Sequence, residues 1–189
     1  MTRTQFLVCL LFCASLQTRC LCQPSFAVIP ATLPSAEGGS ANVLLIEVDK
    51  AQFSLRTPNG YGTQVSQENR SIVFTSADGS SAITVRVTTN FPAALPRAED
   101  LRDIVAKKYP GASVLQSSPC VSDYGPGLCF DFVQPAPNGL ALRIRDAYVA
   151  YPGGSFEFIF SCNGADYDKN RLSFAWLLNS FRSQPKSAK

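Results

Sequence analysis

Arginines and tyrosines on alternating positions of expected strands are the residues in this chain whose spacing best suits binding. Arg143 and Arg145 alternate with apolar residues, and Arg86 alternates in the same way with Val85 and Val87. Successive residues of a strand point to opposite faces, so we expect one solvent-exposed face of the sheet to carry the three arginines. Exposed tyrosines beside them would extend such a surface. The predicted binding residues, for a protein or a small ligand, are Arg86, Arg143, Arg145, Tyr148 and Tyr151.

Acid–base chemistry has few candidate groups, because the chain contains no histidine. This excludes a Ser-His-Asp triad, a Cys-His dyad and a histidine zinc site. Asp131 and Glu157 lie beside aromatics on expected strands, where burial would raise a carboxyl pKa. Pairing with Arg143 and Arg145 across strands is the interpretation that we favour for them. No nucleophile motif or glycine-rich phosphate loop occurs, so we predict no catalytic residue and no cofactor.

Three of the seven cysteines lie outside the N-terminal segment, at Cys120, Cys129 and Cys162. A Gly-Pro-Gly turn signal between the first two predicts a hairpin that brings them within bridging distance. We therefore predict a Cys120–Cys129 disulfide and a buried thiol at Cys162. Another pairing, or a metal site of three cysteines, is the alternative, although the spacing matches no common metal pattern.

Residues 1–22 have the composition of a signal peptide. Arg3 precedes an apolar run over residues 6–16 that is too short to span a bilayer. An extracytoplasmic location, secreted or periplasmic, follows, and an uncleaved leader would be the chain's attachment to a membrane.

The chain has 17 basic and 14 acidic side chains, and two of the basic ones, Arg3 and Arg19, belong to the leader. The nearly neutral remainder argues against nucleic acid as a partner.

The rest of the chain predicts a linker at 23–40 and one α+β domain at 41–185. Apolar alternation predicts strands, and Asp78-Gly79 predicts a hairpin between two of them. A period near 3.6 predicts two amphipathic helices, at 97–109 and 167–182, the second with Asp166 as N-cap and with Leu172, Ala175 and Trp176 widening its apolar stripe. Strands are expected at 43–48, 53–55, 71–75, 83–88, 113–121, 128–133, 140–151 and 156–162. The order predicts an antiparallel sheet covered by two helices.

Several local features resemble the PsbP-like superfamily, named for an extrinsic protein of photosystem II. A strand leads into Pro58-Asn59-Gly60-Tyr61, an amphipathic helix lies mid-chain, and an aromatic strand precedes a final helix that ends near Phe181-Arg182. The likeness covers residues 51–183 and implies that family's α/β/α sandwich. It also implies a non-catalytic binding or assembly accessory. The absence of a twin-arginine transit sequence and of histidine gives no support to a role in water oxidation.

These observations predict an exported, non-enzymatic binding or assembly-accessory domain. Two alternatives stay open. One is a hydrolase that uses a carboxylate pair such as Asp131 and Glu157. The other is a structural envelope component anchored by an uncleaved leader.

Overall fold

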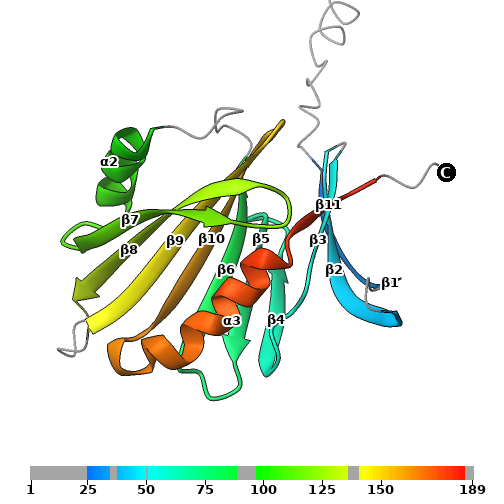
Figure 1. Cartoon of the computed structure of the whole chain (residues 1–189), viewed down its shortest axis with the longest axis horizontal. Helices are drawn as coiled ribbons and strands as arrows, with labels where there is room; N and C mark the ends of the chain where they lie inside the picture. Colours follow the sequence, from blue (N-terminus) through cyan, green and yellow to red (C-terminus); the bar gives the residue numbers. More distant parts are fainter. Residues whose placement is uncertain (1–24, 35–37, 50, 89–96, 136–140, 186–189) are drawn as a thin grey trace, which may run out of the picture.

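The computed structural model describes residues 25–34, 38–49, 51–88, 97–135 and 141–185. The predicted leader at 1–22 and its four cysteines lie outside this part of the chain. The described strands form two antiparallel sheets (Figure 1). The larger has the order β4-β5-β6-β10-β9-β8-β7, and the smaller has the order β1-β2-β3-β11.

The larger sheet comprises seven strands, and hairpins connect most of its sequential neighbours. The turn at Pro152-Gly153 joins β9 to β10, with Tyr151 opposite Gly154. The Asp78-Gly79 turn joins β5 to β6, as the sequence predicts. The strands are β4 (Tyr61–Ser66), β5 (Ser71–Ser76), β6 (Ser81–Thr88), β7 (Ser113–Val121), β8 (Pro126–Pro135), β9 (Ala141–Tyr151) and β10 (Gly154–Asn163).

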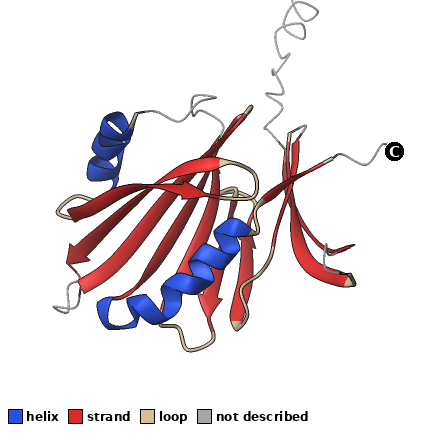
Figure 2. Cartoon of the chain, viewed as in Figure 1, coloured by secondary structure: helices blue, strands red, loops and turns tan. Residues whose placement is uncertain are grey.

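The helix α3 (Tyr167–Asn179) covers one face of this sheet, as Figure 2 shows. Period-two alternation sends Ile83, Val85, Phe158 and Phe160 to that face, where they are buried. Phe174 of α3 stacks on Phe160 with 5.7 Å between ring centroids. Burial of these large apolar side chains makes this layer the main core of the domain.

The helix α2 (Ala98–Lys108) lies at the opposite face. Tyr109, which directly follows it, packs its ring 4.5 Å from that of Phe132, and Lys108 reaches Asp146 and Glu157. These sheet residues alternate with the ones that face α3. The expected α+β arrangement of antiparallel strands and helices is thus observed, although the strands are divided between two sheets. The apolar stripe expected of α2 involves side chains outside the described part of the structure, so its amphipathic packing stays a prediction.

The smaller sheet comprises β1 (Phe26–Pro34), β2 (Ser40–Val48), β3 (Ala51–Leu55) and β11 (Arg182–Gln184). Phe181 lies between α3 and β11 and is fully buried. Its ring stacks on Phe53 of the smaller sheet at 5.3 Å and lies 4.7 Å from Phe156 of the larger one. The end of α3 therefore joins the two sheets through one aromatic cluster.

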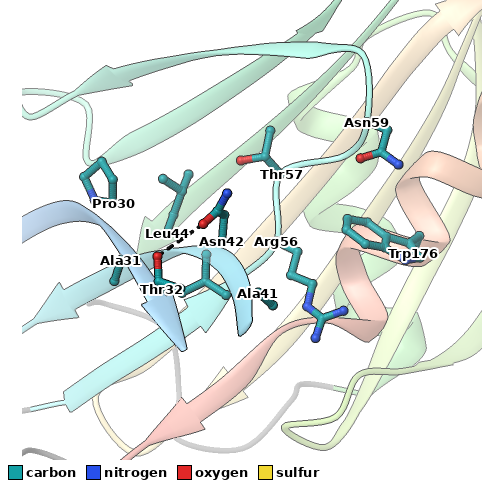
Figure 3. A pocket seen from close by; sticks show the side chains of 11 residues that line it. Pro30, Ala31, Thr32, Ala41, Asn42, Leu44, Arg56, Thr57, Asn59 and Trp176 are labelled. Atoms are coloured by element: carbon teal, nitrogen blue, oxygen red, sulfur yellow. Dashed lines mark hydrogen bonds between the residues drawn. The ribbon is translucent and has the colours of Figure 1, made fainter. Parts of the chain in front are cut away.

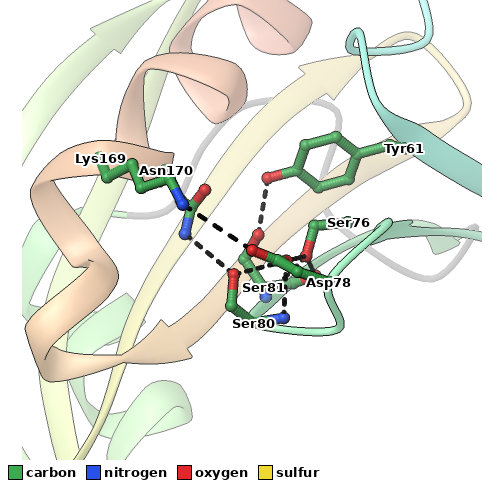
Figure 4. A network of polar contacts seen from close by, with 7 residues as sticks. All are labelled: Tyr61, Ser76, Asp78, Ser80, Ser81, Lys169 and Asn170. Atoms are coloured by element: carbon green, nitrogen blue, oxygen red, sulfur yellow. Dashed lines mark hydrogen bonds and ion pairs between the residues drawn. The ribbon is translucent and has the colours of Figure 1, made fainter.

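The tip of the β5–β6 hairpin is tied to α3 by polar contacts (Figure 4). Asp78 accepts hydrogen bonds from the Ser76 hydroxyl and from the backbone N–H of Ser80. These bonds hold the pKa of Asp78 far below its usual value. Lys169 lies 3.8 Å from the same carboxylate, and the Asn170 amide donates to the Ser80 hydroxyl. The hairpin and the start of α3 are thereby held together.

Four parts of the structure differ from the sequence-based expectation. The expected linker at 23–40 contains β1, whose Pro30 and Pro34 are tolerated because β1 is an edge strand. The strands fall into two sheets, and β4 and β11 were not expected. The helix α3 ends at Asn179, since the following residues join the smaller sheet. Asp166 makes no side-chain cap hydrogen bond.

Candidate binding groove

Arg56 is placed by the contact between the smaller sheet and the end of α3. It follows β3, and its backbone N–H donates to the Ser180 hydroxyl at 2.9 Å. That hydroxyl donates in turn to the carbonyl of Leu177 at 2.7 Å. A turn closed by the bond from the Tyr61 N–H to the Pro58 carbonyl then leads the chain into β4. Arg56 is therefore held against α3, although more than a hundred residues separate them in the sequence.

A cavity of about 620 Å³ lies between the smaller sheet and α3 (Figure 3). This is within the range of about 300–1,000 Å³ that small-molecule sites occupy. Trp176 projects into it from α3 with 42% of its surface exposed. Its lining residues are Pro30, Ala31, Thr32, Ala41, Asn42, Val43, Leu44, Arg56, Thr57, Asn59 and Trp176. We call this region the Arg56 groove.

Two smaller cavities continue the Arg56 groove, and both include Arg56. One, of about 250 Å³, also includes Ser54, Ser180 and Arg182. The other, of about 170 Å³, includes Trp176 and Asp123. Arg182 is paired with Asp123, since its Nε donates to the carboxylate at 2.6 Å. Within the described part of the chain, the Arg56 guanidinium has neither a hydrogen bond nor an ion pair.

Arg143 and Arg145 come together, as expected, but on the face that α3 covers. They line a cavity of about 260 Å³ with Asp131, Tyr167 and other residues near the start of α3. The Arg145 guanidinium lies 3.2 Å from the Asp131 carboxylate, which also accepts the Tyr167 hydroxyl at 2.7 Å. Arg143 stacks over the Tyr167 ring at 3.9 Å. The favoured cross-strand pairing of Arg145 with Asp131 is therefore observed.

Arg86 lies on the opposite face of the sheet, so the expected single surface is not formed. In the sheet, Arg86 of β6 and Tyr148 of β9 lie opposite Glu157 of β10. Arg145 of β9 lies opposite Phe160 of the same strand. Adjacent residues of β10 point to opposite faces. The expectation failed because alternation predicts which residues of one strand share a face. It does not predict which residues of two strands far apart in the sequence lie on the same face of the sheet.

A buried ion cluster surrounds Glu157 on the α2 side. Lys108 Nζ lies 2.6 Å from Glu157 and 3.1 Å from Asp146, and Arg86 lies 3.6 Å from Glu157. Tyr148 donates its hydroxyl to Asp146 at 3.1 Å. Burial and the nearby Glu157 raise the pKa of Asp146 to about 7. Burial alone would lower the pKa of Lys108, but the two carboxylates outweigh it and raise that pKa.

Tyr151 is not a surface residue. It is 3% exposed, and its ring packs 5.3 Å from those of Phe53 and Phe156. Tyr148 is also 3% exposed. Both tyrosines face packed layers, so neither contributes to an open binding surface.

Asp131 and Glu157 cannot form the catalytic pair of the hydrolase alternative. Asp131 pairs with Arg145 in register, and Glu157 pairs with Tyr148, so the two carboxylates lie on opposite faces. The pair that the fold brings together is Asp146 and Glu157, and Lys108 bridges it. Among the described residues, no group of histidines, cysteines or carboxylates is arranged to hold a metal ion.

The expected Cys120–Cys129 bridge is absent, and both side chains are thiols. Cys120 lies opposite Gly127, and Cys129 lies opposite Ser118, so the cysteines are diagonal neighbours and not a directly opposed pair. Their thiols share a hydrogen bond, which lowers the pKa of Cys120. Cys162 is buried at 2% exposure, as expected.

The residues of the Arg56 groove were not identified as a site from the sequence. Trp176, Leu172 and Ala175 were expected to widen the apolar stripe of the last helix, but all three are exposed. The chain's single tryptophan on a solvent-facing helix position is a signal that becomes visible only once the buried side of α3 is known.

Comparison with known proteins shows the fold. No family model matches the chain, and no curated protein matches it. The solution structure of cyanobacterial PsbP from Synechocystis is similar, with 12% identity, a TM-score of 0.51, and coverage of 82% of this chain and 92% of that one. This likeness confirms the PsbP-like fold that the sequence suggested.

Two further solved structures are similar at lower scores. LpqN of Mycobacterium tuberculosis has 13% identity and a TM-score of 0.49, with 84% of this chain and 92% of that one covered. A Bacteroides thetaiotaomicron protein has 13% identity and a TM-score of 0.48, with 72% of this chain covered. The chain spans about half of that protein, 47% of its length.

Among the described residues, none of the helices has the length and apolarity needed to cross a bilayer.

Proposed function

We propose that this protein is an exported, non-enzymatic binding or assembly-accessory domain that holds its ligand or partner in the Arg56 groove. The observation that carries the proposal is the Arg56 guanidinium. It has no partner within the described part of the chain, and it shares a cavity with the half-exposed ring of Trp176. Arginine and tryptophan are both enriched among the residues that dominate binding, and ligand pockets combine aromatic lining with a few charged or polar groups.

The chemistry of the chain supports a non-enzymatic role. The chain has no histidine, and the carboxylate pair that the sequence suggested is divided between two faces of the sheet. The Asp146–Glu157 pair is engaged by Lys108, which suits a structural ion cluster. Fold likeness at low identity gives no chemistry of its own.

Export is proposed from the composition of residues 1–22. N-terminal sequencing of the native protein from the extracytoplasmic fraction tests it. A start after the apolar run at 6–16 supports export with cleavage. Retention of Met1 would instead favour the alternative of an envelope component anchored by its leader.

A photo-crosslinking experiment tests the groove as the binding site. We would replace Trp176 with p-benzoylphenylalanine and irradiate the protein in its native compartment. The matched control is the same replacement at Leu172, which lies one turn earlier on α3, is 65% exposed, and is not among the residues that line the groove. The proposal expects a discrete adduct at position 176 and none at 172. Equal adducts at the two positions, or none at 176, would contradict it.

A further inference from the structure

The cationic character of the Arg56 groove distinguishes it from the other arginine-lined cavity. At the start of α3, Arg145 pairs with Asp131, and Arg171 pairs with Asp168 at 3.1 Å. There the positive charges are largely compensated by carboxylates. In the Arg56 groove, the described lining residues of the main cavity include no carboxylate.

The rest of the groove combines apolar surface with a few polar groups. Trp176, Leu44 and Pro30 supply flat or aliphatic surface, and Thr57 and Asn59 supply hydrogen-bonding side chains. These apolar and polar side chains line the same cavity as the Arg56 guanidinium (Figure 3). A guanidinium presents a fork of donors that matches carboxylate and phosphate oxygens, and an indole ring favours flat apolar groups.

We infer that the Arg56 groove binds a small organic anion, whose carboxylate or phosphate contacts Arg56 and whose apolar body packs against Trp176. This inference rests on the proposed function and specifies the ligand of the same site. Charge complementarity carries it, because the guanidinium has no partner among the described residues and the described lining of the main cavity includes no carboxylate. Asp123, in the adjoining smaller cavity, is already paired with Arg182.

A peptide added as an extra strand beside β1 does not fit the same geometry. β2 is paired on both sides, by β1 and by β3. The free edge of β1 carries Pro30 and Pro34, which have no N–H to donate. On the β1 side the groove is therefore equipped to recognise a ligand through side chains, which suits a small molecule.

Collisional quenching of Trp176 tests the charge of the groove without requiring a known ligand. Trp176 is the only tryptophan, so its fluorescence reports this site alone. Iodide, caesium and acrylamide are an anionic, a cationic and a neutral quencher. Because iodide quenches free indole more efficiently than caesium does, each constant is divided by that for N-acetyltryptophanamide. At low ionic strength we expect the normalised iodide constant to exceed the caesium one, and Arg56→Gln to reduce it about two- to fivefold. Arg102→Gln, an exposed charge on α2, is the control and should change nothing.

A pair of related probes tests the ligand class. 1-Anilinonaphthalene-8-sulfonate is anionic, and N-phenyl-1-naphthylamine is the similar molecule without the sulfonate. We expect energy transfer from Trp176 to both probes and tighter binding of the anionic one. Arg56→Gln should weaken the anionic probe about tenfold or more and leave the neutral probe unchanged. Trp176→Ala should weaken both probes, as measured by their own fluorescence, while circular dichroism confirms folding.

The outcomes separate this inference from the proposed function. Equal affinity for the two probes, unaffected by Arg56→Gln, would overturn anion recognition and leave the groove as a binding site if crosslinking at position 176 succeeds. Equal normalised quenching constants for iodide and caesium would also overturn anion recognition. Failure of crosslinking together with anion-selective quenching would instead contradict the proposed function and leave the cationic groove established.

Discussion

The ion cluster beneath α2 gives a prediction that can be worked through in free energy. Replacing Lys108 with methionine removes the ammonium that lies 2.6 Å from Glu157 and 3.1 Å from Asp146. Asp146 is fully buried, and Lys108 is 25% exposed on its side chain. Glu157 keeps Arg86 at 3.6 Å. The variant therefore leaves Asp146 as the group without a cation.

The expected loss has two parts. At pH 5, Asp146 is protonated in the wild type because its pKa is about 7, and in the variant because removal of the Lys108 ammonium, which lowers that pKa, raises it further. The loss there reflects the missing hydrogen bond to Glu157 and should be about 1–3 kcal/mol. Above the Asp146 pKa, the wild type ionises Asp146 against Lys108, whereas the variant must keep it protonated. Each further pH unit then costs the variant about 1.4 kcal/mol more than the wild type.

The direction in which stability changes with pH follows from the linkage between folding and proton binding. A carboxyl whose folded-state pKa is raised contributes stability that is fully present below its unfolded pKa of 3.8 and is lost as pH rises through about 7. Wild-type stability from this group therefore declines up to about pH 7 and then levels, while that of the variant continues to decline. By pH 9 the total difference should reach about 4–6 kcal/mol, near the upper range for a broken buried ion pair.

Urea unfolding followed by circular dichroism at pH 5, 7 and 9 measures this difference. Lys107→Met is the matched control, because Lys107 is the adjacent residue of α2 and is exposed. It should change stability by less than about 0.5 kcal/mol at every pH. A Lys108→Met loss that does not change between pH 5 and pH 9 would refute the assignment of Asp146 as the titrating partner.

Three further predictions concern packing and thiol exposure. Phe181→Ala should cost about 3–5 kcal/mol in urea unfolding, because Phe181 is fully buried between the two sheets; a loss below 1 kcal/mol would mean that the aromatic cluster does not join them. Gly127→Ala should destabilise the protein by about 1–3 kcal/mol or more, since an added Cβ would lie 2.5 Å from the Tyr148 carbonyl oxygen. Gly125→Ala is its control, because no atom lies within 4 Å of the added Cβ, and equal effects at the two glycines would contradict the register of β8. Cys120 is half-buried and has a lowered pKa, whereas Cys129 and Cys162 are 1% and 2% exposed. Cys120→Ser should therefore remove one fast-reacting thiol in a dithionitrobenzoate assay, while Cys129→Ser and Cys162→Ser should remove none.

Much of the fold could be predicted because its signals are local. Alternation identified most strands of the larger sheet, and the Asp78-Gly79 turn identified one of its hairpins. The period near 3.6 identified both helices. The expected PsbP-like fold depended on the same local features, and the likeness in fold to cyanobacterial PsbP confirms that fold.

The site could be predicted only in part. Arg145 and Asp131 meet because β8 and β9 are consecutive strands that pair with each other. A short connection between them limits which residues can lie opposite one another. Arg86 could not be placed in the same way, since β6 and β10 are distant in the sequence and their relative register is decided by packing. The edge strand β1 was missed because its prolines and small residues suggest a linker, although an edge position tolerates them.

By itself, the sequence determined the faces of individual strands, the hairpin turns, the two helices and the absence of histidine chemistry. Tertiary structure alone decided which of those faces coincide. It divided the expected arginine surface, set Lys108 between two carboxylates, and brought Arg56 beside Trp176 across 120 positions of the sequence. The physical reason is that local periodicity follows from backbone geometry within a few residues, whereas a binding groove depends on burial contacts, such as those of Phe181, between segments far apart in the chain.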